Sequence, residues 1–198
     1  MIARPLEIDF DAELARYHAE QSRRRSKGRH QSEIIKYIMT RLEPKRFAGS
    51  GEPDSKLWEI GFIWEEIAAR VLTRKFGIIK HQVELERDGI FMTLDGWNSK
   101  LQRVREYKAT KISSRHQITS NRYWHWHAQL KGYCLEMETR EAEIIPLYIN
   151  GGYESAGGRF GAVACRPVVV EYSRGEIREN WEMMLRTRDR MDKEERAA

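Results

Sequence analysis

The feature that most constrains the fold is a set of three short extended segments enclosed by amphipathic helices. The extended segments cover residues 81–86, 90–98 and 103–110. Their β-branched and aromatic residues are bounded by polar turns, which is typical of strands. Residues 87–89 fit the first turn and residues 99–102 fit a four-residue connection after the second segment. The pattern therefore predicts a three-stranded meander.

Helical periodicity flanks this meander on both sides. Residues 56–75 repeat apolar side chains at intervals of three and four, and we expect a helix that buries Leu57, Ile60, Trp64, Ile67, Ala68, Val71 and Leu72. Residues 122–138 predict a second helix, and residues 142–149 predict a further strand. The order helix, three strands, helix, strand predicts an α/β or α+β sandwich with a mixed sheet.

Additions are expected at both ends of this core. Residues 1–47 predict a helical addition of two helices joined by a basic run, with apolar residues that include Ile34, Ile35, Ile38 and Leu42 on the second helix. Glycine and proline in residues 48–54 mark a soft boundary before the core, which spans residues 48–198. A glycine-rich loop over residues 150–158, a strand within 162–172 and a helix from about Gly175 are predicted to follow.

Positive charge is concentrated near the N-terminus. The net charge is +5, but 33% of the residues are charged, so the distribution matters more than the total. The densest basic run covers residues 23–30. Such a run is suited to neutralising phosphates, and it is equally typical of a solvated helix end.

The number of cysteines and the length of the apolar segments indicate where in the cell the protein is expected. Cys134 and Cys165 are too few for a disulfide framework or a four-cysteine metal site, which is typical of a reducing environment. The first residues do not resemble a signal peptide, and no stretch is long enough to cross a bilayer. We therefore expect a cytoplasmic protein with no membrane partner.

Two acids and a lysine on the last two strands of the meander form the main candidate site. The four-residue connection would set Asp95 across from Glu106, with Lys108 on the same face as Glu106. Tyr107 would point the other way and leave its carbonyl beside the acids. Mg²⁺ and Mn²⁺ prefer such oxygen ligands, and Lys108 could orient a coordinated water or stabilise phosphoryl charge. Taken alone, a Glu-x-Lys triplet is more often cross-strand charge pairing.

Two helices could add to this site. Glu65 has the small and apolar neighbours Gly61, Ala68 and Leu72 on its face, which suggests that the carboxylate looks inward toward a cation. On the later helix, His125, Gln129 and Tyr133 share one stripe at intervals of four residues. Each of these three residues, taken singly, is more often an ordinary surface or packed residue.

The whole ordered set resembles the PD-(D/E)XK nuclease superfamily, and within it the RecB-like branch with phage exonucleases and CRISPR-associated adaptation nucleases. The resemblance covers about residues 57 to 149 and implies a restriction-endonuclease-like core. It implies that Asp95, Glu106, the Tyr107 carbonyl and Glu65 hold Mg²⁺ or Mn²⁺ and that Lys108 is the catalytic lysine. Gln129 and Tyr133 would form the final motif, which orients DNA and the site.

The chain departs from the family in two respects. Leu94 stands where the family name has proline, and the two cysteines are too few for the iron-sulfur cluster of several adaptation nucleases. A cluster-free enzyme is therefore implied. The tail over residues 176–185 is similar to tails of phage-encoded members, which suggests a role in recombination or DNA processing in a bacterial or phage-infected cytoplasm, as a homo-oligomer or beside a recombination partner protein.

These features lead to an expected function with open alternatives. The first hypothesis is an exonuclease that acts on DNA ends or single strands. The residues expected to contact DNA are Arg23, Arg24, Arg25, Lys27, Arg29 and His125. Tyr123 and Trp124 could stack on bases, although core packing is the more common role of such residues. An endonuclease of the same fold and a catalytically idle nucleic-acid-binding module remain as alternatives.

Overall fold

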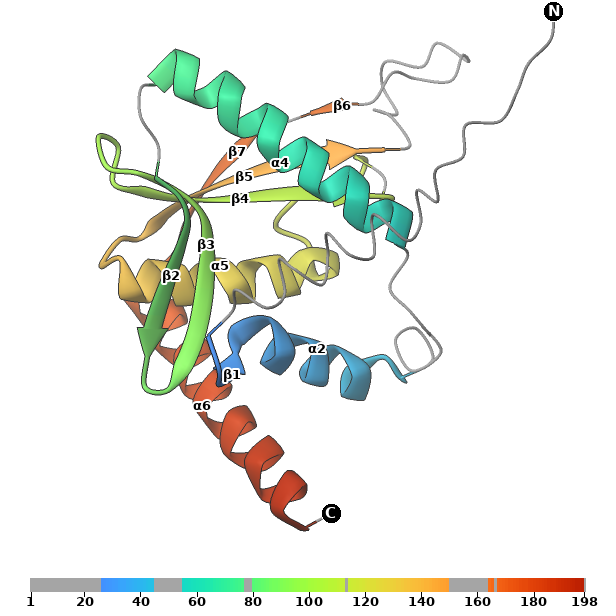
Figure 1. Cartoon of the computed structure of the whole chain (residues 1–198), viewed down its shortest axis with the longest axis vertical. Helices are drawn as coiled ribbons and strands as arrows, with labels where there is room; N and C mark the ends of the chain where they lie inside the picture. The colour runs from blue at the N-terminus through green and yellow to red at the C-terminus, as the bar shows by residue number, and fades with distance from the viewer. Residues whose placement is uncertain are drawn as a thin grey trace, which may run out of the picture.

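The computed structural model describes residues 26–44, 55–76, 80–112, 114–149, 164–165 and 167–197. Within these residues a seven-stranded mixed sheet is covered by α4 on one face and α5 on the other (Figure 1). The elements are β1 (Arg29–His30), α2 (Gln31–Leu42), α4 (Ser55–Phe76), β2 (Lys80–Arg87), β3 (Ile90–Asn98), β4 (Arg103–Thr110), η1 (Asn121–Tyr123), α5 (Trp124–Glu136), β5 (Glu141–Tyr148), β6 (Ala164–Cys165), β7 (Val168–Glu171) and α6 (Arg174–Ala197). The predicted mixed sheet flanked by helices is confirmed.

The predicted meander forms one side of this sheet, with β2 at the edge. β2 pairs antiparallel with β3, and β3 pairs antiparallel with β4. The turn between β2 and β3 places Asp88 and Gly89 at φ values of 51° and 75°, in the left-handed region that glycine adopts without strain. β4 then pairs parallel with β5, which makes the sheet mixed.

Part of one edge of β3 has no strand partner within the described chain, and the candidate site described below lies at this part. β2 occupies the other edge along its length, from Lys80 opposite Trp97 to Arg87 opposite Ile90. β1 and β4 must therefore share the remaining edge, where β1 pairs at residues 90–91 and β4 pairs at residues 96–98. Between them, residues 92–95 have no strand partner on this edge within the described chain.

α4 covers its face of the sheet with a narrower stripe than the sequence predicts. Ala68 is buried against Tyr107 and Ile145, and Trp64 and Leu72 pack beside them. Ile67 and Val71, which were also expected to be buried, are 50% and 56% exposed, so that part of the prediction is wrong. Ile67 directly precedes Ala68 and Val71 directly precedes Leu72. One residue turns an α-helix by about 100°, so Ile67 and Val71 point away from the part of α4 that packs on the sheet. The side chain of Leu57 lies outside the described residues.

The opposite face carries the main core. α5 packs between the sheet and α6, and α2 packs against both helices. Ile34 and Ile35 of α2 are buried as predicted, whereas Leu42 at its end is 66% exposed. Ion pairs join Arg29 to Asp192 of α6 (2.8 Å) and Arg41 to Glu194 (2.7 Å). The first of the two helices predicted within residues 1–47 and the glycine-rich loop over residues 150–158 lie outside the described residues. No helix of the described chain is both long and apolar enough to cross a membrane.

Candidate active site

The candidate site begins where β3 and β4 separate. Their pairing ends at Gly96 opposite Arg105, one residue before Asp95 and Glu106 would face each other. Beyond this point the Asp95 side chain takes the place of the ladder, because its Oδ2 accepts a hydrogen bond from the Tyr107 backbone N–H at 3.0 Å. The hydrogen bond thus fixes Asp95 against β4 at the fork where the two strands separate. Asp95 and Glu106 are not paired across the strands, but they lie near enough for the Asp95 charge to act on Glu106.

Glu106 is the most unusual group in this fork. It is fully buried, and burial together with the nearby Asp95 carboxylate raises its pKa to about 8. Lys108 lies on the same face and forms an ion pair with Glu106 Oε1. Burial lowers the pKa of Lys108, but the carboxylates of Glu106 and Asp95 more than offset this effect and raise it. Tyr107 points to the other face and packs on α4, as predicted.

A chain of hydrogen bonds ties Lys108 to α5. Lys108 Nζ donates to Gln129 Oε1 at 3.3 Å, and Gln129 Nε2 donates to the Tyr133 hydroxyl at 2.5 Å. Tyr133 in turn donates to the Thr93 carbonyl of β3 at 2.6 Å. Thr93 belongs to the stretch of β3 that lacks a strand partner on one edge, and Tyr133 ties this stretch to α5. The predicted pair Gln129 and Tyr133 therefore lies beside Lys108.

A small pocket opens in front of these groups. Its volume is about 160 Å³, and its walls come from α2, α4, β3 and α5. The lining residues include His30, Gln31, Ser32, Glu65, Asp95, Gln129 and Tyr133. Glu65 is half-buried on α4, and its charge contributes to raising the pKa of Glu106. The acid predicted on the first core helix is thus placed on the same pocket as Asp95.

The donor set suits a hard divalent cation, although it is not a complete cage. Glu106 Oε2 is buried and accepts no hydrogen bond within the described chain. A buried carboxylate oxygen without a donor is costly, and a cation would satisfy it. No three His, Cys, Asp or Glu side chains of the described residues are grouped closely enough to hold a metal by themselves. A site of two carboxylates and the Tyr107 carbonyl, completed by water and a phosphate oxygen, does not require such a group.

Several predicted DNA contacts lie elsewhere. Arg29 forms ion pairs with Asp192 and Glu195, both at 2.8 Å, so its guanidinium joins β1 to α6 instead of facing open solvent. His125 is half-buried next to Trp124 and does not line the pocket. Lys27 is exposed at the start of the described chain, and Arg23, Arg24 and Arg25 lie outside the described residues.

The aromatic residues around the start of α5 pack in the core to different extents. Tyr123 is fully buried and packs on Trp126 with ring centroids 4.5 Å apart. Both side chains therefore belong to the core, in agreement with their more common role. Trp124 is half-buried and packs against the same core.

One wall of the pocket was not predicted from the sequence. His30, Gln31 and Ser32 at the start of α2 line it opposite α5. Gln31 is 2% exposed and reaches α5 with its amide. Gly132 was the available signal, because a glycine inside a helix often marks close approach of another group.

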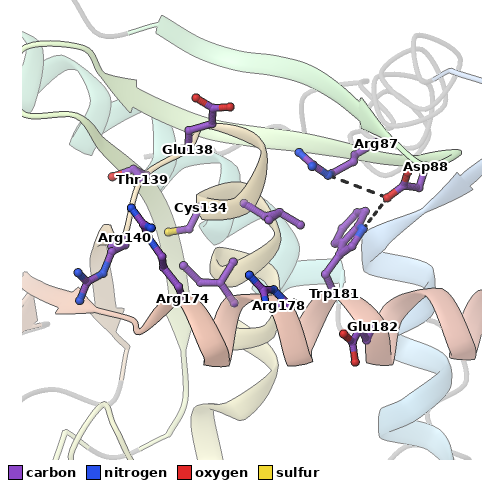
Figure 2. Close-up of a pocket in the computed structure, with 12 residues that line it drawn as sticks. Arg87, Asp88, Cys134, Glu138, Thr139, Arg140, Arg174, Arg178, Trp181 and Glu182 are labelled. Carbon is purple, nitrogen blue, oxygen red and sulfur yellow. Dashed lines mark hydrogen bonds and ion pairs between the residues drawn. The ribbon is translucent and has the colours of Figure 1, made fainter.

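A larger crevice lies at the other end of α5 and does not contain these groups. It measures about 620 Å³ between the β2–β3 turn, the end of α5 and the start of α6 (Figure 2). Some of its polar side chains already have partners within the protein. Arg87 pairs with Glu136 at 3.1 Å, and the Trp181 indole N–H donates a hydrogen bond to Asp88 at 2.8 Å. None of the residues predicted to form the site lines this crevice. Size alone therefore does not locate the chemistry.

Comparison with known proteins supports the fold. No protein-family model and no curated protein matches the chain. The solved structure of SSO0001 is similar at a TM-score of 0.56 and 13% identity, over 91% of this chain and 87% of that chain. A phage related exonuclease from Haemophilus somnus 129PT has a TM-score of 0.50 and 13% identity, with 82% of each chain covered.

An alkaline exonuclease, LHK-Exo from Laribacter hongkongensis, is also similar. Its TM-score is 0.54 at 12% identity, over 83% of this chain and 88% of that chain, and a second structure holds dAMP. At these identities the likeness shows a shared mixed sheet flanked by helices.

Proposed function

We propose that this chain is a metal-dependent deoxyribonuclease of the PD-(D/E)XK type, and that it acts as an exonuclease on DNA ends or single strands. The observation that carries the proposal is Glu106, a fully buried carboxylate with a pKa raised to about 8, which pairs with Lys108 and interacts with Asp95, a residue that lines the pocket. A buried acid next to a second acid and a lysine is typical of a catalytic site. The fold shared with two exonucleases supports the same assignment.

The residues present fit a bound Mg²⁺ or Mn²⁺. Asp95, Glu106, the Tyr107 carbonyl and Glu65 would hold the ion. When bound, such an ion lowers the pKa of a water molecule and so supplies a nucleophile near neutral pH. Lys108 provides an ammonium group on the same side of the sheet, where it can stabilise charge on a phosphate.

DNA is the proposed substrate class, and the polarity of attack is left open. The complex of LHK-Exo with dAMP supports a deoxynucleotide substrate for this fold. A role in phage recombination or DNA processing is consistent with the phage related exonuclease among the similar structures.

Labelled linear and circular DNA, each incubated with and without Mg²⁺ or Mn²⁺, test this function. We expect metal-dependent digestion of linear DNA, with intact circles. Nicking of the circles would instead assign an endonuclease. Binding without digestion under all conditions would contradict the proposal and favour the idle binding module.

Metal binding should depend on pH because Glu106 must lose its proton. The pKa of about 8 means that the carboxyl keeps its proton below this pH, so the ion must displace it. We expect the affinity for Mn²⁺ to rise by up to about tenfold per pH unit between about pH 6 and pH 8, and to level off above that. Calorimetric titration in two buffers of different ionisation enthalpy measures both the affinity and the released proton. A constant affinity across this range would show that Glu106 is not a ligand.

The basic run before α2 should contribute to DNA affinity through phosphates. Reversing the charge of Arg23, Arg24 and Arg25 to Glu should weaken binding and reduce the slope of log affinity against log salt, by about 0.9 for each phosphate of duplex DNA that the run no longer neutralises. Filter binding at several salt concentrations measures this slope. The matching control is Arg186→Glu on α6, where Arg186 is exposed and pairs with Glu182. An unchanged slope in the triple variant would leave the run as a solvated segment.

A further inference from the structure

Gln31 connects the start of α2 to the helix that carries Gln129. Its Nε2 donates to the Ala128 carbonyl at 3.3 Å and to the Gln129 carbonyl at 3.2 Å, which uses both amide hydrogens. The side chain is 2% exposed and lines the same pocket as Asp95. A single carboxamide therefore holds one turn of α5 from the pocket side.

α5 is shaped to admit this carboxamide. A Cβ atom at Gly132 would lie 2.0 Å from Gln31 Nε2, closer than any real contact. Glycine in a helix interior is unfavourable relative to alanine, so the bare position costs α5 intrinsic stability. The space above Gly132 is the space that the Gln31 amide occupies.

Packing alone does not explain a glutamine at this position. Gln31 Oε1 is buried and accepts no hydrogen bond within the described chain. An unsatisfied buried acceptor destabilises a fold, and an apolar side chain would avoid the penalty. The amide is retained because its two donors set the position of the α5 backbone.

That turn controls the lysine of the site. Gln129 follows Ala128, and its side chain accepts from Lys108 and donates to Tyr133. A shift of this turn would move Gln129 Oε1 away from Lys108 Nζ. Lys108 would then keep its ion pair with Glu106 but lose its hydrogen bond to Gln129. The contacts run from Gln31 through the α5 backbone to Lys108.

We propose that Gln31 is a positioning residue for the reaction, and this rests on the proposed nuclease function. It holds the Ala128 and Gln129 carbonyls so that the Gln129 side chain keeps the Lys108 ammonium beside Glu106.

Gln31→Ala tests the proposal by separating turnover from binding. We expect kcat to fall about tenfold or more, because small misplacements of a catalytic group are costly, while KM for DNA and Mn²⁺ affinity change less than about twofold. Asn180→Ala is the matched control, since Asn180 Nδ2 donates to the same Ala128 carbonyl at 3.0 Å from α6. This control should keep kcat. Equal losses in both variants, or a normal kcat in Gln31→Ala, would overturn the proposal.

A double-mutant cycle between Gln31 and Gly132 tests the contact between the Gln31 amide and Gly132. Gly132→Ala should expel the Gln31 amide and lower both kcat and Tm in the otherwise unchanged chain. In the Gln31→Ala background the same substitution should leave kcat unchanged and should not lower Tm, because the space is already vacated. Additive losses would contradict the proposed coupling.

Gln31→Glu gives an independent readout through pH. A carboxyl group at this position can donate to an α5 carbonyl only while it keeps its proton. Its kcat, relative to that of the unsubstituted chain, should therefore decline as pH rises. A constant ratio across pH would oppose the proposal. If the unsubstituted chain digests no DNA, the nuclease function and this role fail together, whereas an active chain with a normal Gln31→Ala variant refutes the positioning role alone.

Discussion

Replacing Glu106 with Gln should lower kcat for DNA cleavage by about a thousandfold or more, because the substitution removes a carboxylate ligand and leaves an amide of the same shape. The chain should still fold. The pKa of Glu106 is raised from 4.5 to about 8, so the folded state binds more protons than the unfolded state between these values. Stability should therefore fall as pH rises through this window, and the variant should lack that part of the fall.

Single-turnover cleavage and thermal unfolding at pH 6 and pH 8.5 without metal measure both effects. The matched control is Glu179→Gln, since Glu179 is exposed on α6 and far along the chain from the site. The control should cleave DNA normally. Cleavage by Glu106→Gln within tenfold of the unsubstituted rate would remove Glu106 from the chemistry.

Replacing Lys108 with Met should lower kcat by roughly a hundredfold to a thousandfold while Mn²⁺ still binds, since the ammonium stabilises charge and is not a ligand. Folding should also weaken. Glu106 is buried, and removal of its only ion-pair partner among the described residues leaves a charge that costs about 3 kcal/mol when ionised. This loss should be smaller at pH 6, where Glu106 keeps its proton, and Mn²⁺ should partly restore it at pH 8.5.

Lys131→Met provides the comparison for this variant. Lys131 lies on α5, with a side chain 20% exposed against 26% for Lys108 on β4, and pairs with Glu176 at 3.6 Å. Its ion-pair partner is therefore an acid of α6 and not Glu106. A Lys108→Met variant that turned over DNA as fast as Lys131→Met would show that the lysine has no catalytic role.

Local patterns were sufficient to predict the strands and the main acids. β3 and β4 have the predicted bounds because alternation and turn residues act within a few positions. Glu106 and Lys108 share a face because side chains alternate in a strand. Gln129 and Tyr133 share a helical stripe for an equally local reason. Asp95 and Glu106 come near each other because a hairpin brings neighbouring strands together, whereas Gln129 and Tyr133 reach the site through the packing of α5 on the sheet.

Residues whose roles depend on distant partners could not be predicted. Gln31 acts on Ala128, 97 positions away, and no spacing rule connects them. Arg29 pairs with Asp192, 163 positions away, which the basic run did not reveal. Ile67 and Val71 fit an apolar stripe, but their exposure depends on how much of α4 the sheet covers. These contacts and exposures are set by how the helices and the sheet pack together, which local sequence patterns do not specify.

Asp95 and Glu106 must share one divalent ion beside Lys108 if the proposed chemistry is to take place. Diffraction from crystals of the protein with Mn²⁺ and a short oligonucleotide, collected at the manganese absorption edge, locates the ion directly. We predict an anomalous peak about 2.0–2.2 Å from oxygens of both Asp95 and Glu106, with a DNA phosphate next to the ion. A pocket without a peak at saturating Mn²⁺, or a peak bound only by other residues, would contradict the proposed site.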